Sequence, residues 1–583
     1  MTNVNIPASI RGAGRTRIDI TRWFQVTIHS VSRSHSLLLF LILALAFLVR
    51  ISTVRYGLPF SYQEQEQRIV NIALRMGATH DLDPHFVGKG LLWYLLLAEF
   101  GVYYVIGRAA GIFGGAFDFA KSYFVDHSPF YLIDRTNQAV LAMLSIWAVY
   151  CLGRRFLGER GGLWAAAIGA FTAYHVDASR YAIVDLLNAL FGALCLIQLA
   201  RYDEEGTAPP LAWASIFAAL SCSAKLPGGI LIAAVLALAL MRRRFRHVVA
   251  AVLIFGLAVA LTTPAVFLSP GTFFAALREE LGQRLGAEAA QSHATEIVSA
   301  FKSLLLTGLT LPGLFLLLAG LRHPLGSRAF KWLGLVLPSV VYLLRMGHHL
   351  GPNYFLVLWP AITLILAAGV AHISKWRPGG GEALGALVLA SHLAFLPGSE
   401  VLPVISNTRN YLKPVPAHQT IEWIKANVPR GARIAVMSPG TWKGRLFPMP
   451  EELRARIERF KNIPNPLGID YNIGNEQMYE WISKIVETDT AVPAYRFLNL
   501  DVETRAEQAS ERRRESFIFI EQILPFEAWS DVERLEADYF LFIDGMDRSD
   551  GRLVAVSKRL QAMPLASAYP PFYLYRLTPR NDP

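Results

Sequence analysis

The densest group of side chains that could carry out chemistry lies between residues 62 and 89. It reads Tyr62-Gln63-Glu64-Gln65-Glu66-Gln67-Arg68, continues to His80-Asp81-Leu82-Asp83-Pro84-His85, and ends at Lys89. Carboxylates in such a group can take a proton from a hydroxyl, and a lysine can balance the charge of a leaving group. For any single residue, a solvated loop beside a capped helix explains the sequence equally well. Only the group as a whole favours a functional site.

A second group of charged residues stands at the ends of apolar runs. Asp185 closes the segment Ser179-Arg180-Tyr181-Ala182-Ile183-Val184-Asp185, where it could orient a substrate or simply pair with Arg180. Lys225 is favoured as a residue that extends its ammonium to an interface. His348 and its neighbour His349 could bind phosphate or a metal, but a polar loop is favoured there. Without a His-x-x-x-His or Cys-x-x-Cys pattern, the sequence requires no cofactor and leaves a divalent metal open.

The amino-acid composition indicates whether these residues belong to a soluble or a membrane protein. Hydrophobic residues make up 53% of the 583 residues and charged residues only 17%, whereas soluble proteins carry about 25% charged residues. This excludes an ordinary cytosolic enzyme. The net charge of +11 lies in the apolar part, because the first 397 residues hold 32 Lys and Arg against 20 Asp and Glu. Such an excess is typical of membrane topology and not of nucleic-acid binding.

Apolar runs of membrane-spanning length begin after a basic N-terminal segment. The first is 36–53, and it follows Arg11, Arg15, Arg17, Arg22 and Arg33, which predicts a cytoplasmic N-terminus and an uncleaved anchor. A cleaved signal peptide with Ala44-Leu45-Ala46 is the alternative. The further runs are 90–111, 135–153, 161–174, 182–200, 210–224, 227–241, 247–268, 299–320, 331–345, 353–373 and 381–397.

Basic residues in the short connections fix which runs cross the membrane. They are Arg154, Arg155 and Arg160, then Arg242, Arg243, Arg244 and Arg246, then Arg322 and Arg328, and finally Lys375 and Arg377. All of them fall on the cytoplasmic side only if 90–111 is a juxtamembrane or re-entrant helix. The sequence therefore predicts a cytoplasmic tail over 1–34 and a membrane domain of about eleven transmembrane helices over 35–397. A long first external loop spans 55–134.

The C-terminal segment 398–583 differs in composition and is expected to be a soluble α/β domain outside the membrane. It holds 24 basic and 25 acidic residues and none of the three cysteines, so it contains no disulfide. A helix-like stretch at 418–428 leads into a predicted strand at 432–437. Further strands are expected at 539–543 and 572–577.

The order of these blocks resembles the bacterial members of glycosyltransferase family 39. These are GT-C enzymes related to protein O-mannosyltransferases and to the transferase that adds aminoarabinose to lipid A. The matching blocks are Tyr-x-x-x-Glu at 62–66, Ala73-Leu74-Arg75-Met76, Asp81-Leu82-Asp83-Pro84-His85-Phe86, a Lys89-containing helix entry, and Ser179 to Asp185. Weaker similarities lie at 224–227, 263–264, 270–273 and 353–360. The resemblance covers most of 36–440 and implies a GT-C-like membrane domain.

The resemblance implies site residues, with one departure from the family pattern. The family has an Asp-Glu pair in the first external loop, but Gln65 stands in the Asp position and Glu66 in the Glu position. Glutamine cannot act as a base, so the expected base is Glu66, with Glu64 as substitute and Asp185 as a second acidic residue. Lys89 and Arg180 are expected to bind the donor phosphate. The remaining expected pocket residues are Gln65, Tyr62, His85, His348 and Asn353.

The implied function is inverting transfer of a sugar from a polyprenyl-phosphate donor to an acceptor hydroxyl at the outer face of a bacterial inner membrane. The expected partners are this donor, the lipid bilayer, and a glycan, lipid or protein acceptor, with no nucleic acid. Two alternatives stay open. A transporter would show paired half-sequences with broken helices, and none is found. A catalytically inactive relative that binds lipid-linked sugar, or assists another transferase, is favoured by Gln65.

Overall fold

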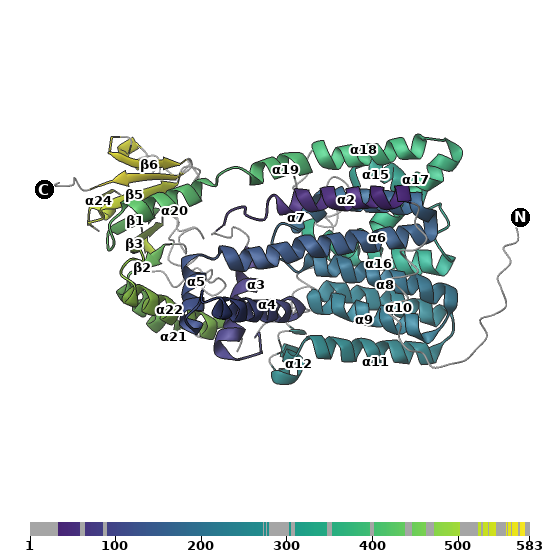
Figure 1. Cartoon of the computed structure of the whole chain (residues 1–583), viewed down its shortest axis with the longest axis horizontal. Coiled ribbons are helices and arrows are strands. Elements are labelled where there is room, and N and C mark those ends of the chain that lie inside the picture. Colours follow the sequence, from purple (N-terminus) through teal and green to yellow (C-terminus); the bar gives the residue numbers. More distant parts are fainter. Residues whose placement is uncertain are drawn as a thin grey trace, which may run out of the picture.

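Helices make up most of the structure, and a mixed β-sheet lies toward its C-terminal end (Figure 1). In this computed structural model, the described residues are 33–58, 64–84, 90–271, 309–346, 352–396, 402–437, 446–461 and 471–501, with shorter pieces between 273 and 304 and between 523 and 577. The expected combination of several apolar helices with a C-terminal sheet is confirmed.

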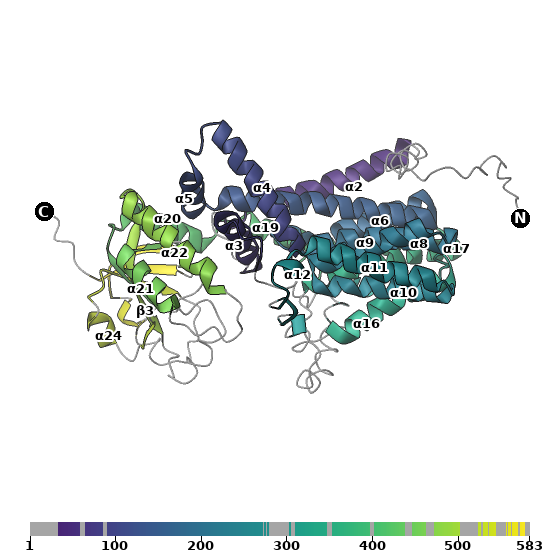
Figure 2. The ribbon, with the colours of Figure 1, turned by 90° about the horizontal axis from the view of Figure 1, so that it is seen from below.

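The longer apolar helices lie side by side in one bundle (Figures 1 and 2). They are α2 (Arg33–Ile51), α6 (Ser128–Phe171), α8 (Asp185–Glu205), α9 (Ala208–Ala224), α10 (Ile230–Met241), α11 (Phe245–Thr262), α15 (Thr310–Gly320), α16 (Leu337–Met346), α17 (Trp359–Trp376) and α18 (Gly380–Ala394). Short helical segments adjoin them: α7 (Ala173–Ala178), η1 (Leu226–Gly229), α12 (Ala265–Leu268), η3 (Phe330–Val336) and η5 (Pro352–Val357). The helices therefore form where the sequence has its apolar runs.

Four helices in the described part of the chain are long and apolar enough to cross a membrane, namely α2, α6, α11 and α4 (Gly90–Ala109). Helix α11 exposes Val249, Leu253, Leu257 and Leu261, which form one apolar face, as expected of a helix that faces lipid. Helix α4 lies outside the main bundle, with α3 (Glu64–Thr79) and α5 (Ala116–Val125). In both views α3 lies between the bundle and the C-terminal sheet, and α4 and α5 lie on the same end of the bundle.

The stretch assigned to α6 contains a reversal of the chain at Gly158. This glycine has a φ of 71° and a ψ of −176°, and a positive φ is readily adopted by glycine. A Cβ atom on Gly162 would lie 2.9 Å from the carbonyl oxygen of Tyr150. In a continuous helix these two residues would be about 18 Å apart. The two expected runs 135–153 and 161–174 are therefore antiparallel helices joined by a tight turn.

The basic connections between helices gather at one end of the bundle. Arg155 pairs with Glu204 at the end of α8. Asp203 accepts a bond from Arg242 at 3.2 Å and one from the Ser327 hydroxyl at 2.8 Å. Connections that lie far apart in the sequence are thus joined by ion pairs and hydrogen bonds at the same end.

The C-terminal sheet has the strand order β2-β3-β1-β5-β7-β6, with β4 paired to β3. The strands are β1 (Arg433–Met437), β2 (Phe447–Pro448), β3 (Ala494–Asp501), β4 (Ile523–Pro525), β5 (Tyr539–Ile543), β6 (Leu565–Tyr569) and β7 (Phe572–Arg576). The central strand β1 runs parallel to β3 and β5, whereas β7 is antiparallel to β5 and β6. The three predicted strands are confirmed as β1, β5 and β7.

Helices cover this sheet because alternate strand residues are apolar on both faces. Ile434 and Val436 pack with Ile421 and Ile424 of α20 (Pro416–Asn427) on one face. Ala435 packs with Phe540 and Leu560 in a second cluster. The other helices of this domain are α21 (Pro450–Lys461), α22 (Tyr471–Thr488) and α24 (Trp529–Arg534). Helix α20 thus matches the helix expected at 418–428.

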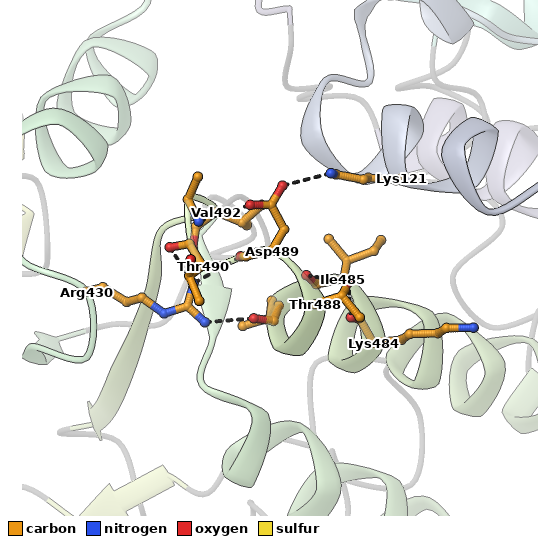
Figure 3. Close-up of polar contacts among 10 residues, drawn as sticks. Lys121, Arg430, Lys484, Ile485, Thr488, Asp489, Thr490 and Val492 are labelled. Carbon is orange, nitrogen blue, oxygen red and sulfur yellow. Dashed lines mark hydrogen bonds and ion pairs between the residues drawn. The ribbon is translucent and has the colours of Figure 1, made fainter. Parts of the chain in front are cut away.

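The C-terminal domain contacts the first loop through helices α5 and α22 (Figure 3). The Lys121 ammonium lies 2.7 Å from the Asp489 carboxylate. The Phe117 ring stacks on Trp481 at 5.7 Å, and the Lys484 ammonium lies over Phe117. Arg430 donates to backbone carbonyls around 486–492 and holds the end of α22 in place. The C-terminal part therefore contacts helix α5 directly, in addition to its covalent connection to the bundle.

Two glycines allow close backbone contact between α15 and α17. A Cβ atom on Gly369 would overlap the carbonyl of Leu316, and one on Gly320 would overlap the carbonyl of Ile365. Small residues at such crossings let membrane helices approach closely. We expect Gly369→Leu to lower the free energy of unfolding by about 3 kcal/mol or more, because the backbone cannot move aside as a side chain can. Thermal unfolding in detergent measures this.

The matched control is Gly256→Leu, because nothing lies within 4 Å of a Cβ atom at that position of α11. This control should change the midpoint by no more than a few degrees. Equal midpoints for the two variants would contradict the close contact of α15 and α17.

Candidate active site

Glu66 and Arg135 form a buried ion pair that joins the first loop to the bundle. Glu66 on α3 and Arg135 on α6 are at most 1% exposed. The Arg135 Nε and Nη2 atoms donate to the two Glu66 carboxylate oxygens, each at 2.8 Å. This two-bond geometry gives strong and directional pairing.

Both members of this pair also bind backbone groups. Arg135 Nη1 donates to the carbonyls of Val54 and Tyr56, each at 2.7 Å. The Ala182 backbone N–H donates to Glu66 Oε1 at 2.7 Å. The Glu66–Arg135 pair therefore connects α3, α6, the segment after α2 and the turn that leads into α8. Both oxygens of Glu66 are occupied.

Asp185 has one bound and one unbound carboxylate oxygen. It begins α8, only three residues after Ala182, so the predicted residues Glu66 and Asp185 are brought to the same short segment. Lys225 Nζ donates to Asp185 Oδ1 at 2.6 Å. Asp185 is 1% exposed, and its Oδ2 has no hydrogen-bond partner. Since a buried carboxylate oxygen without a partner is costly, this atom is suited to receive a bond from a substrate.

Arg180 likewise combines bound and unbound groups. Its Nη2 donates to the Thr408 hydroxyl, and its guanidinium lies 4.8 Å from the centre of the Tyr411 ring. Its Nε and Nη1 have no partner, although the residue is 1% exposed. A planar guanidinium with free N–H groups can bind a phosphate. Asp185 pairs with Lys225 and not with Arg180, which was one of the two possibilities that the sequence left open for Asp185.

Several buried polar residues of this region were missed by sequence reasoning. Asp134 is 0% exposed, accepts a bond from Gln138 at 2.8 Å and keeps its Oδ2 without a partner. Arg50, also fully buried, donates to His175 Nδ1 and to the Ala170 carbonyl. The sequence does contain a signal, because charges that adjoin or interrupt an apolar run seldom occur without a function.

Other predicted residues do not enter this geometry. Tyr62, His85, Lys89 and His348 lie outside the described residues. Glu64 and Asn353 fall in α3 and η5, but their side chains are outside the description. Gln65 lies half-buried in α3. Within the described ranges, no group of three or more His, Cys, Asp or Glu residues could hold a metal ion.

Residues 135–269 match the family model described as dolichyl-phosphate-mannose-protein mannosyltransferase. The family resemblance is confirmed. The matched stretch contains Arg135, Arg180, Asp185 and Lys225, so the family sequence coincides with most of the polar geometry described above. A comparison with curated protein sequences gives no match.

Solved structures of two kinds of protein are similar to this chain. ArnT from Cupriavidus metallidurans bound to undecaprenyl phosphate shows 12% identity and a TM-score of 0.43, and the match covers 92% of this chain and 97% of that one. The oligosaccharyltransferase of Archaeoglobus fulgidus, in complex with Zn and sulfate, shows 13% identity and a TM-score of 0.42, over 70% of this chain. The chain spans 60% of the length of that archaeal protein.

Breaking the Glu66–Arg135 pair should destabilise the protein. We expect Glu66→Gln or Arg135→Gln to lower the free energy of unfolding by about 3–5 kcal/mol, because each leaves a buried charge without its partner. The double variant should lose less unfolding free energy than the sum of the losses in the two single variants. Thermal unfolding of the purified variants in one detergent measures this.

Glu204→Gln provides the control, because the Arg155–Glu204 pair is partly exposed. It should cost less than about 1 kcal/mol. Strictly additive losses at 66 and 135 would show that the two side chains do not interact.

Proposed function

We propose that the protein is a membrane glycosyltransferase that moves a sugar from a polyprenyl-phosphate donor to an acceptor hydroxyl. One observation carries this proposal. The stretch that matches a family described by a lipid-phosphate mannose donor also holds a buried carboxylate oxygen and buried arginine N–H groups without partners. Transfer from a lipid phosphate needs both kinds of group, a base for the acceptor and cations for the leaving phosphate.

Asp185 is our candidate for the base. Its Oδ2 is free to accept the acceptor proton, whereas both oxygens of Glu66 accept bonds from Arg135 and the Ala182 N–H. A proton on Glu66 would remove the charge that Arg135 binds and so weaken a buried ion pair. We therefore assign Glu66 to holding the segment that carries Asp185, and Glu64 remains a second candidate carboxylate.

Arg180, and Lys89 by the resemblance, are proposed to bind the donor phosphate. As the bond between the sugar and the phosphate oxygen breaks, that oxygen gains negative charge. Nε and Nη1 of Arg180 can bind it. The acceptor oxygen forms the new bond from the opposite side of the anomeric carbon, and its proton passes to Asp185. This sequence of events inverts the anomeric configuration.

The same proposal places the two ends of the bundle on opposite sides of the membrane. The N-terminus and the basic connections would be cytoplasmic, with about eleven crossings, and the candidate site and the C-terminal domain would lie outside. The clustering of Arg155, Arg242 and Ser327 contacts at one end of α8 supports this, because cytoplasmic loops are rich in basic residues.

Asp185→Asn should lower the rate of polyprenyl phosphate release by about 10²-fold or more, the usual contribution of a positioned base. The assay uses purified protein, a polyprenyl-phosphate sugar and a cell extract as the source of acceptor.

Asp203→Asn is the matched control, because Asp203 is a buried aspartate on the same helix, about 27 Å along its axis. Asp203→Asn should retain at least about a third of the wild-type rate, because Asp203 lies far from the candidate site and is not the proposed base. Equal rates for Asp185→Asn and the wild type would remove Asp185 from the mechanism. A wild-type rate in Asp185→Asn together with a large loss in folded Glu66→Gln would return the role of base to Glu66.

Cysteine labelling tests the arrangement across the membrane. With a maleimide that cannot cross membranes, Lys89→Cys should react in intact cells, and Arg244→Cys only after the membrane is opened. Each position is compared with the wild type, whose three cysteines are buried or partly buried. Labelling of both positions from the same side would contradict the proposed topology.

A further inference from the structure

Helix α19 (Val404–Tyr411) joins the bundle to the C-terminal domain and contacts the segment that carries Arg180. Figure 1 shows it between α18 and α20, beside α7. Asn407 Nδ2 donates to Asp177 Oδ1 at 2.8 Å, and the Tyr411 hydroxyl donates to the same oxygen at 2.9 Å. Thr408 accepts the bond from Arg180. Three side chains of one short helix therefore bind residues of the four-residue stretch 177–180.

Tyr411 is the centre of these contacts. Its ring lies 4.3 Å from the Tyr56 ring on one side and 4.8 Å from the Arg180 guanidinium on another. Burial, and then the charge of Asp177, raise the pKa of Tyr411, so its hydroxyl stays protonated and can donate to that carboxylate. Because the proton is directed to Asp177, the Tyr181 hydroxyl must donate to the Tyr411 oxygen.

These contacts fix the guanidinium of Arg180 without occupying all of it. The Tyr411 ring contacts the guanidinium and the Thr408 hydroxyl accepts a bond from it, so two side chains of α19 restrain Arg180. Asp177 Oδ1 accepts from Asn407 and Tyr411, while the Arg180 Nη2 group donates to Thr408. The Arg180 Nε and Nη1 groups are therefore left in a defined direction, buried and without partners.

We propose that Tyr411 is a positioning residue that holds Arg180 in the orientation needed to bind the leaving phosphate. Asn407 and Thr408 act with it. Through this helix, the start of the C-terminal region forms part of the candidate active site. The inference rests on the proposed function, because it assigns a support to the cation that the proposed reaction uses.

The contact of α5 with α22 provides a control that leaves Arg180 untouched (Figure 3). Lys121 and Asp489 are both about one third exposed and join the C-terminal domain to the first loop. If docking of the domain in general supported activity, loss of this pair would reproduce the loss of Tyr411. If α19 acts locally on Arg180, loss of the Lys121–Asp489 pair would leave activity unchanged.

The experiment compares kcat and KM for a polyprenyl-phosphate sugar in Tyr411→Ala, Tyr411→Phe and Lys121→Ala. Tyr411→Ala should lower kcat about 10- to 100-fold with KM within about threefold, because a misplaced Arg180 fails when the phosphate gains charge. Tyr411→Phe keeps the ring beneath Arg180 and should retain at least about a fifth of kcat. Lys121→Ala should leave both constants within about twofold.

A second measurement needs no substrate. Hydrogen–deuterium exchange at the amides of 177–184 should be faster in Tyr411→Ala than in the wild type, and unchanged in Lys121→Ala. Equal kcat losses in Tyr411→Phe and Tyr411→Ala, a matching loss in Lys121→Ala, or unchanged exchange at 177–184 would each overturn the inference. A wild type that consumes no donor overturns the proposed function, and the exchange result then decides alone whether α19 holds the Arg180 segment.

Discussion

The buried ion pair between Glu66 and Arg135 is the interaction on which the arrangement of the candidate site depends. It binds four parts of the chain: α3, α6, the residues after α2 and the turn before α8. A buried ion pair contributes little net stability to the folded protein. Removing one of its two charges, however, destabilises the protein strongly. The pair therefore acts mainly as a specific clamp. It joins α3 to the turn over 180–185, and this turn carries Arg180 and Asp185.

The polar groups around this clamp differ in how fully they are satisfied. Glu66 and the guanidinium Nε and Nη groups of Arg135 are bound, which suits a support. Asp185 and Arg180 each keep buried polar atoms without partners, which suits a site that binds a ligand. The two ends of α8 show the same contrast, since Asp203 is bound by Arg242 and Ser327 whereas Asp185 keeps a free oxygen. This contrast is the basis for proposing a supporting role for Glu66 and reacting roles for Asp185 and Arg180.

Periodicity and composition predicted the helices and strands of this fold well, but they did not predict the contacts between these elements. The apolar runs coincide with helices, and three strands were placed correctly, because these depend on local sequence. The Glu66–Arg135 pair joins residues 69 positions apart, and the Tyr411 contacts join residues about 230 apart, for which a single sequence carries no local signal. The family resemblance implies that Glu66 is the base. The sequence alone could not show that Arg135 donates hydrogen bonds to both oxygens of Glu66. Asp134 was overlooked because it falls at the end of the expected external loop 55–134, although it adjoins the apolar run 135–153.

The most direct test of the account is release of polyprenyl phosphate by the wild-type protein. Membranes that contain the protein would be incubated with a panel of polyprenyl-phosphate sugars and a native extract as acceptor source, beside a related enzyme that consumes members of the same panel. We expect release from at least one donor, with transfer of its sugar. No release from any donor that the related enzyme consumes would contradict it, and would favour a protein that binds lipid-linked sugar without transferring it.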